Sequence, residues 1–409
     1  MGVTYRVPGA ILTERDHIVP LDHDAPDGAT ITVFSREVAA PGGEDRPYLI
    51  FQQGGPGGGA TRPTSPLSGW LKRAVQDYRV LLIDQRGTGR STPVGRHIPG
   101  DTPEQQAHYL AHFRADSIVR DAELIRRELG VDRWSILGQS FGGFCTLTYL
   151  SFAPDGLREA FLTGGLSPIG RPGDDVYGVT YGRAVERNRV YFERYPGDRE
   201  RAREIMRWLD KEEVRLPSGD RLSARRFRQL GMWLGDSAGF ELLHHVIELP
   251  FASNAFLHDM ENAVRFARNP LYATLHESSY ADGGATRWSA ARLLTEEFDA
   301  EGWFTAEHVF PWMWQEIGAL NGHWPAADLL AEWPWPRLYD EQQLRRNEVP
   351  VVATIYVDDL YVDADFARET ASTVRGCRPW ITNEYEHNGL RADGERLLGR
   401  MIDMMKGSA

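Results

Sequence analysis

One serine of the chain lies in a context that is typical of a reactive nucleophile. Ser140 is the central residue of a Gly-Gln-Ser-Phe-Gly pentapeptide at residues 138–142. The apolar run 134–137 before it favours a strand, and the apolar run 144–150 after it favours a helix. A serine on a sharp turn between a strand and a helix exposes its Oγ, which suits acyl transfer. The alternative is a glycine-rich turn in which the serine only caps the helix.

A serine hydroxyl needs a neighbouring base, and the base needs a carboxylate that orients it. His387 is the only histidine after His323 and follows a predicted strand over 378–383, so it is the leading base. The other histidines fall on predicted helices, hairpins, loops or a long helical segment, where a structural role is expected. Asp359, just beyond the preceding strand, is the preferred acid, and Asp358 is the alternative.

A cluster of glycines follows an earlier apolar strand over residues 46–53. Residues 54–59 read Gly-Gly-Pro-Gly-Gly-Gly, so the backbone of this loop can approach another group closely. A phosphate-binding loop would continue with Lys and then Ser or Thr, whereas Ala-Thr-Arg follows here. We therefore expect the loop to offer a backbone N–H to an oxyanion, with Gly55 and Phe141 as the two donors.

A second polar loop follows the next predicted strand. It reads Asp-Gln-Arg-Gly-Thr-Gly-Arg-Ser over residues 84–91. We expect Asp84 and Arg86 to form an ion-paired brace that shapes the glycine loop, and a catalytic role for either is the less favoured alternative.

These loops need a sheet that brings them together. An antiparallel hairpin is expected within residues 1–48, and one helix from about Thr102 to Leu129. Largely apolar runs predict the strands of a mostly parallel sheet, and the helical segments between them predict an α/β fold. These runs are 46–53, 78–83, 134–137, 158–166, 349–357 and 378–383.

The pattern changes between the fourth and fifth of these strands. From about residue 167 to 345 helical periodicity dominates and tryptophan is dense, at positions 288, 303, 312, 314, 324, 333 and 335. We interpret this stretch as a mainly helical domain, residues 167–345, inserted between two parts of a core, residues 1–166 and 346–409. Its tryptophans are expected to serve packing.

Composition limits the classes of partner. The chain has 409 residues and a formal net charge of −12, which argues against nucleic acid. We find no leader pattern and no apolar run that approaches the ~20 residues needed to span a bilayer, so no membrane partner and a cytoplasmic location are expected. Two cysteines, Cys145 and Cys377, are too few for a disulfide framework or a zinc cluster. No metal or cofactor is expected, and the residues indicate no oligomeric state.

Together the motifs resemble the prolyl aminopeptidase (proline iminopeptidase) family of α/β-hydrolase serine peptidases. The resemblance rests on the glycine loop, the Asp84 loop, the motif around Ser140 and the spacing from Asp359 to His387. Two departures occur. Gln53 stands where the family has His, and residues 356–359 read Tyr-Val-Asp-Asp where the family has Gly-Arg-x-Asp, so Asp358 stays open as the acid.

The resemblance implies an eight-stranded, mostly parallel sheet with the helical insertion as a cap over the active site. It also implies release of an N-terminal residue, preferentially Pro, from peptides through an acyl-enzyme. A free α-ammonium must then be bound, and cap carboxylates do this in the family. Glu277 is the first choice, with Glu241 and Glu307 as weaker ones.

Other functions remain open on the same motifs. An esterase or amidase acting on a small molecule would share the fold, because the chemistry depends on the cap. An epoxide hydrolase would normally carry Asp in the place of Ser140. A binding protein without activity is the alternative from another class, and the presence of Ser, acid and His in order argues against it.

Overall fold

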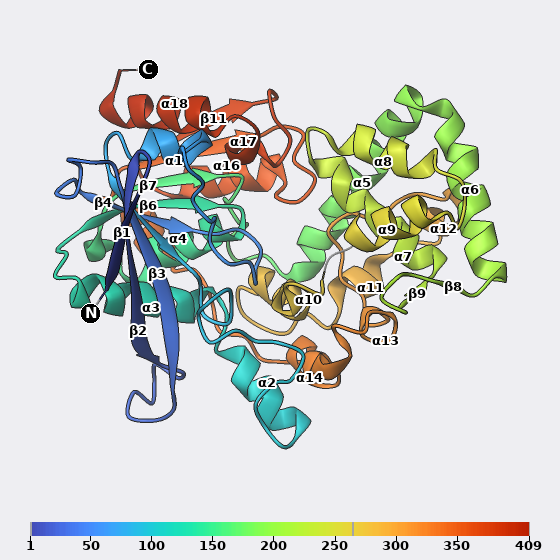
Figure 1. Ribbon diagram of the computed structural model, residues 1–409, viewed down its shortest axis with the longest axis horizontal. Coiled ribbons are helices and arrows are strands. Elements are labelled where there is room, and N and C mark those ends of the chain that lie inside the picture. The colour runs from blue at the N-terminus through green and yellow to red at the C-terminus, as the bar shows by residue number, and fades with distance from the viewer. Residues whose placement is uncertain (1, 264–265, 409) are drawn as a thin grey trace.

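A nine-stranded sheet forms the framework of the computed structural model, which describes residues 2–263 and 266–408 (Figure 1). The strand order is β1-β2-β3-β5-β4-β6-β7-β10-β11. Neighbours from β1 to β5 are antiparallel, and those from β5 across to β11 are parallel. The strands are β1 (Val3–Val7), β2 (Ala10–Pro20), β3 (Thr30–Ala39), β4 (Tyr48–Gln52), β5 (Arg79–Ile83), β6 (Trp134–Gln139), β7 (Leu157–Thr163), β10 (Val351–Tyr356) and β11 (Cys377–Thr382).

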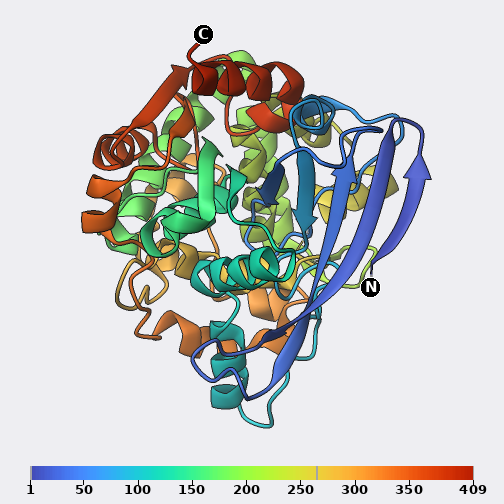
Figure 2. The same cartoon turned by 90° about the vertical axis from the view of Figure 1, so that its left-hand side faces the viewer.

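The predicted α/β fold with a mostly parallel sheet is confirmed, but the sheet has nine strands where eight were expected. The additional strand is β1, which pairs with β2 at the edge of the sheet. Its side chains Val3 and Tyr5 are exposed, so β1 is held at the edge by backbone pairing with β2 and not by burial of its side chains. The predicted N-terminal hairpin is the long β2–β3 pair, visible at one side of the sheet in Figure 2.

Helices cover both faces of the sheet. On one face α1 (Gly69–Ala74) and α18 (Gly394–Lys406) pack together over an apolar cluster that contains Phe51. On the other face α3 (Ala115–Glu128) and α4 (Phe141–Phe152) cover the cluster that contains Ile50. Successive residues of a strand point to opposite faces, so a strand buried on both sides favours consecutive apolar residues, as the first four residues of β4 show. The remaining core elements are η1 (Pro154–Gly156), α16 (Ala364–Thr373) and α17 (Gly389–Ala392).

Between β7 and β10 the chain leaves the sheet and forms a long insertion, at the right of Figure 1. The insertion contains an apolar cluster of its own, which includes Tyr191, Phe227 and Phe304. It is mainly helical, with one short antiparallel pair that the sequence did not predict, β8 (Val214–Arg215) with β9 (Arg221–Leu222). Its helices are α5 (Gly173–Arg194), α6 (Pro196–Lys211), α7 (Ala224–Arg228), η2 (Gln229–Gly235), α8 (Gly239–Ile247), α9 (Asn254–Ala263), α10 (Pro270–Leu275), η3 (Glu277–Tyr280), α11 (Ser289–Leu293), α12 (Glu297–Glu301), α13 (Met313–Glu316), η4 (Asn321–His323), α14 (Ala326–Ala331) and α15 (Glu341–Arg346).

The single helix expected from Thr102 to Leu129 is divided in two, α2 (Pro103–Ala111) and α3. Thr102 caps α2 as predicted, since its Oγ1 accepts a hydrogen bond from the N–H of Gln105. The break follows from Arg114, a buried residue whose guanidinium donates to the carbonyls of Ala281 and Pro336. These long-range hydrogen bonds outweigh local helix propensity, which is a weak preference.

The predicted brace between Asp84 and Arg86 is wrong in its pairing. Asp84 instead accepts from Arg62 and from the N–H of Ala60, and so holds the end of the glycine loop. Arg86 is buried and pairs through two nitrogens with Asp121 of α3, at 2.6 and 2.7 Å. Its other donors reach carbonyls at the end of β2 and before α3. Both residues therefore serve structure, but they fix different parts of the fold.

No helix in the described part of the chain combines the length and the apolar character that crossing a membrane requires.

We expect Asp121→Ala to lower the free energy of unfolding by about 3–5 kcal/mol, because it leaves the buried Arg86 charge without its partner. Asp24→Ala is the matched control, since Asp24 pairs with Arg120 at the surface and its loss costs less than about 1 kcal/mol. Urea titration followed by circular dichroism measures both. Equal effects of the two substitutions would contradict the role given to Arg86.

Candidate active site

Ser140 lies at the turn between β6 and α4, as the sequence predicts. Its φ of 55° is in the left-handed region, which is unusual for a residue other than glycine. The glycines beside it are required by close contacts. A Cβ on Gly142 would lie 1.9 Å from the carbonyl oxygen of Gln52, and one on Gly143 would lie 2.4 Å from that of Gly165. The turn therefore packs α4 tightly on the sheet while the serine side chain stays at the sheet edge.

Three side chains from three strand ends form one hydrogen-bonded chain. His387 Nε2 lies 2.8 Å from Ser140 Oγ, and His387 Nδ1 lies 2.8 Å from Asp359 Oδ2. Ser140 follows β6, Asp359 follows β10 and His387 follows β11, so parallel pairing brings them to the same edge. The exposed Asp358 does not take this position.

Asp359 is held firmly in this arrangement. It is 1% exposed, and its Oδ1 accepts hydrogen bonds from the backbone N–H groups of Tyr361 and Val362, both at 2.9 Å. Because this carboxylate only accepts, the proton between it and the imidazole lies on His387 Nδ1. The unprotonated Nε2 then faces the Ser140 hydroxyl, which is the orientation of a general base.

The electrostatic surroundings favour a proton-accepting His387. Burial opposes the charged imidazolium, but the charge and hydrogen bond of Asp359 outweigh it and raise the pKa of His387 above its usual 6.5. Space for the ring is provided by Gly164, where a Cβ would lie 3.2 Å from Nδ1. The backbone N–H of His387 donates to the carbonyl of Gly235 in the insertion, at 3.1 Å.

The glycine loop, residues 54–59, also lies beside Ser140. A Cβ on Gly54 would lie 2.5 Å from Gln139 Oε1 and 3.1 Å from the Cβ of Ser140, so the loop backbone borders the serine. Gly55 has a φ of 143°, a conformation that L side chains rarely adopt, and it lines the cavity beside Ser140. Phe141 is the first residue of α4, where the N–H has no carbonyl partner within the helix. Gly55 therefore lines the same cavity as Ser140, and Phe141 directly follows Ser140 in the chain.

A cavity of about 560 Å³ opens in front of Ser140 and His387. The sheet supplies its floor through the glycine loop and the Ser140 turn. The insertion supplies much of the rest, including Trp233 and Tyr272. A cavity of this size takes a small ligand or the end of a chain.

Of the three predicted amine-binding acids, only Glu307 lines this cavity. Glu277, the first choice, is buried elsewhere and accepts from the N–H groups of Ser289 and Ala290 at the start of α11. Burial raises the pKa of Glu277 to about 6. Glu241 lies at the surface and pairs with Arg194. The expectation for Glu277 and Glu241 is therefore corrected: one carboxylate caps a helix and the other forms a surface ion pair.

Glu307 has an unusual environment for a carboxyl group. Burial raises its pKa to about 8, the nearby charge of Asp359 adds to this, and His387 opposes it. The Tyr272 hydroxyl donates to it, and His276 Nε2 lies 3.4 Å from its Oε2. Burial lowers the pKa of His276 to about 4, so this imidazole is neutral and brings no charge. Among the residues that the structure describes, no Lys or Arg forms an ion pair with Glu307.

Sequence reasoning missed several residues of the cavity wall. Tyr361 follows Asp359 by two positions, and its ring meets the His387 ring edge to face at 4.9 Å between centroids. Asp236, Arg268 and Arg391 also line the cavity, and Asp236 pairs with Arg391 at 3.6 Å. The position of Tyr361 shortly after a strand could have indicated that it lines the cavity. The residues from the insertion carried no sequence signal, because only the fold of the insertion places them here.

The dense tryptophans of the second half of the insertion do not line this cavity. Trp288, Trp314 and Trp324 pack against one another, with ring centroids 5.2 to 6.2 Å apart. The predicted packing role fits this arrangement.

Comparison with known proteins agrees with this geometry. A family described as alpha/beta hydrolase fold matches residues 47–238. The chain is 49% identical to a proline iminopeptidase of Aeromonas sobria over 401 residues, which is 94% of each chain. It is 35% identical to the proline iminopeptidase aneH of Aspergillus aculeatus, over 93% of this chain and 90% of the relative. The chain therefore belongs to the proline iminopeptidase family of α/β-hydrolases.

Proposed function

We propose that this protein is a serine exopeptidase that releases an N-terminal residue, preferentially proline, from peptides. The observation that carries the proposal is the hydrogen-bonded chain Ser140–His387–Asp359 at a cavity that is also lined by the half-buried acid Glu307. Relatives that match nearly the whole chain and are named proline iminopeptidases support the same substrate class.

The first half of the reaction forms an ester. His387 Nε2 takes the proton of Ser140 Oγ while the oxygen attacks the scissile carbonyl carbon, and Asp359 stabilises the imidazolium that results. The N–H groups of Gly55 and Phe141 stabilise the negative oxygen of the tetrahedral intermediate. His387 then returns the proton to the leaving amine, and the prolyl group remains as an ester on Ser140.

The second half uses water in place of the peptide. His387 takes a proton from a water molecule, which attacks the ester carbonyl, and then protonates Ser140 as the bond breaks. Free proline leaves and the hydroxyl is restored. Every proton passes through the one imidazole that touches both the serine and the carboxylate.

Recognition of the free N-terminus is assigned to Glu307. Its raised pKa means that it carries a proton at neutral pH when the cavity holds no cation. A substrate ammonium supplies the missing opposite charge and favours the carboxylate form, so the buried pair forms only with a charged N-terminus. The aromatic walls Trp233, Tyr272 and Tyr361 provide apolar surface for a proline ring.

We propose that residues 167–345 act as a cap, since this segment contributes Glu307 and much of the cavity wall. A cytoplasmic location is part of the same proposal, and it is supported by the two cysteines, neither of which is in a disulfide.

Loss of the Ser140 hydroxyl or of the Asp359 carboxylate should abolish peptidase activity. We expect Ser140→Ala and Asp359→Asn each to lower kcat on Pro-β-naphthylamide by about 10³-fold or more, because the nucleophile or the orientation of its base is lost. Asp358→Asn is the matched control and should keep activity within about twofold of the wild type, since Asp358 is exposed. Loss of activity in Asp358→Asn with retention in Asp359→Asn would reverse the assignment of the acid.

Substitution of Glu307 should separate amine recognition from ester chemistry. Glu307→Gln is expected to lower kcat/KM on Pro-β-naphthylamide by about 10- to 100-fold, the effect of losing a hydrogen bond to a charged group. Hydrolysis of p-nitrophenyl acetate, which has no amine, should change by less than about threefold. Glu241→Gln is the control.

The wild type should cleave N-acetyl-Pro-β-naphthylamide far more slowly than the free-amine substrate. Equal cleavage of the two would favour an esterase or amidase and would argue against Glu307 as the amine site.

Activity should depend on pH through His387. The imidazole must be neutral to accept the serine proton, and its pKa is raised, so kcat/KM should decline as pH falls below a value above 6.5. A pH–rate profile on Pro-β-naphthylamide measures this limb. An acid limb clearly below pH 6.5 would show that Asp359 does not control the imidazole as the geometry indicates.

A further inference from the structure

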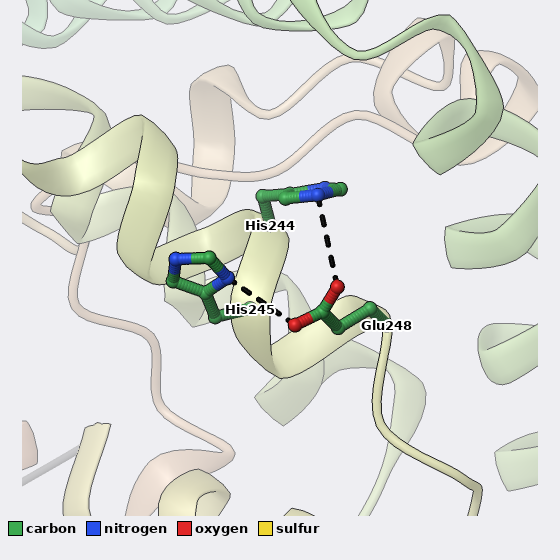
Figure 3. A group of neighbouring side chains, drawn as sticks. All are labelled: His244, His245 and Glu248. Carbon is green, nitrogen blue, oxygen red and sulfur yellow. Dashed lines mark hydrogen bonds and ion pairs between the residues drawn. The ribbon is translucent and has the colours of Figure 1, made fainter.

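Outside the active-site cavity, three potential metal ligands gather at the end of α8 in the insertion: His244, His245 and Glu248 (Figure 3). One ligand atom of each lies within 4.8 Å of the other two. Glu248 Oε1 is 3.3 Å from His245 Nδ1, and Glu248 Oε2 is 3.9 Å from His244 Nε2. The spacing places all three on one side of the helix, because residues three and four apart are neighbours on its surface.

The orientation of His244 is fixed by a second carboxylate. His244 Nδ1 lies 2.9 Å from Oδ2 of the buried Asp198, which also accepts from the Tyr191 hydroxyl. The ring of Tyr195 stacks on the imidazole with centroids 4.1 Å apart. Because an ionised carboxylate only accepts, Nδ1 donates to Asp198, and Nε2 is the ring nitrogen left to bind an ion. Histidines that bind metal commonly donate their other N–H to a carboxylate in this way.

The ligand atoms are close together but not all in direct contact. His244 Nε2 and Glu248 Oε2 lie 3.9 Å apart, which is too long for a direct hydrogen bond. Both lie at the C-terminal end of α8, where the helix dipole adds partial negative charge. A positive ion placed between the imidazoles and the carboxylate satisfies all of these groups at once.

We propose that His244 Nε2, His245 Nδ1 and the Glu248 carboxylate bind one divalent transition metal ion of the Zn²⁺ class, with water completing the coordination. Two imidazoles and one carboxylate suit Zn²⁺, Ni²⁺ or Cu²⁺, whereas Mg²⁺ and Ca²⁺ prefer oxygen ligands. The exposed side chains of His245 and Glu248 are free to close on the ion while Asp198 holds His244. None of the three lines the cavity at Ser140, so the site is separate from the proposed peptidase chemistry.

Isothermal titration of the full-length protein with Zn²⁺ tests the proposal. We expect a binding step with one equivalent of Zn²⁺ that millimolar Mg²⁺ does not displace. His245→Ala and Glu248→Gln should each weaken this step at least about tenfold, and both replace exposed side chains that the fold does not require. Asp198→Asn should weaken it about 10- to 100-fold through the orientation of His244.

His258→Ala, which removes an exposed histidine from the neighbouring helix α9, is the matched control and should bind Zn²⁺ as the wild type does. A wild type that does not bind Zn²⁺ would overturn the proposal. So would His245→Ala and Glu248→Gln variants that bind it as tightly as the wild type, because the ion would then lie elsewhere.

Discussion

The hydrogen bond between His387 and Asp359 is the interaction on which the rest of the site depends. It fixes the proton on Nδ1, points the lone pair of Nε2 at Ser140 and raises the pKa of the imidazole despite its burial. The carboxylate can do this because two backbone N–H groups hold its other oxygen. In the proposed mechanism the nucleophile, the base and the acid act as one unit, and none of them has the required chemistry alone.

The fold provides this unit by placing four loops at one edge of a parallel sheet. The loops after β4, β6, β10 and β11 carry the residues to which we assign the roles of oxyanion donor, nucleophile, acid and base, in that order. The insertion then decides what reaches them. It contacts the base directly, through the carbonyl of Gly235, and it places a carboxyl group of raised pKa beside the reacting atoms. We assign the acyl-transfer chemistry to residues on the loops that follow the strands of the sheet. We assign selection of a charged N-terminus to the insertion.

Sequence reasoning succeeded where local pattern and chain order determine position. Ser140 could be predicted because glycine spacing and flanking apolar runs define its turn, and His387 because one histidine follows the last strand. Sequence reasoning failed where long-range contacts determine the structure. The buried Arg114 breaks a helix that its neighbours favour, and the exposed strand β1 is placed by backbone pairing with β2 and not by burial of apolar side chains. Glu277 looked isolated in the sequence but caps α11, a partner 12 positions away that no local pattern indicated.

Active-site labelling measures the central claim, that Ser140 is made reactive by His387 and Asp359. A fluorophosphonate should give one adduct per chain by mass spectrometry, located on Ser140 by peptide mapping, and the rate of labelling should fall sharply in Asp359→Asn while the fold is kept. An adduct on another residue, or labelling of Ser140 at the same rate without the Asp359 carboxylate, would contradict the account.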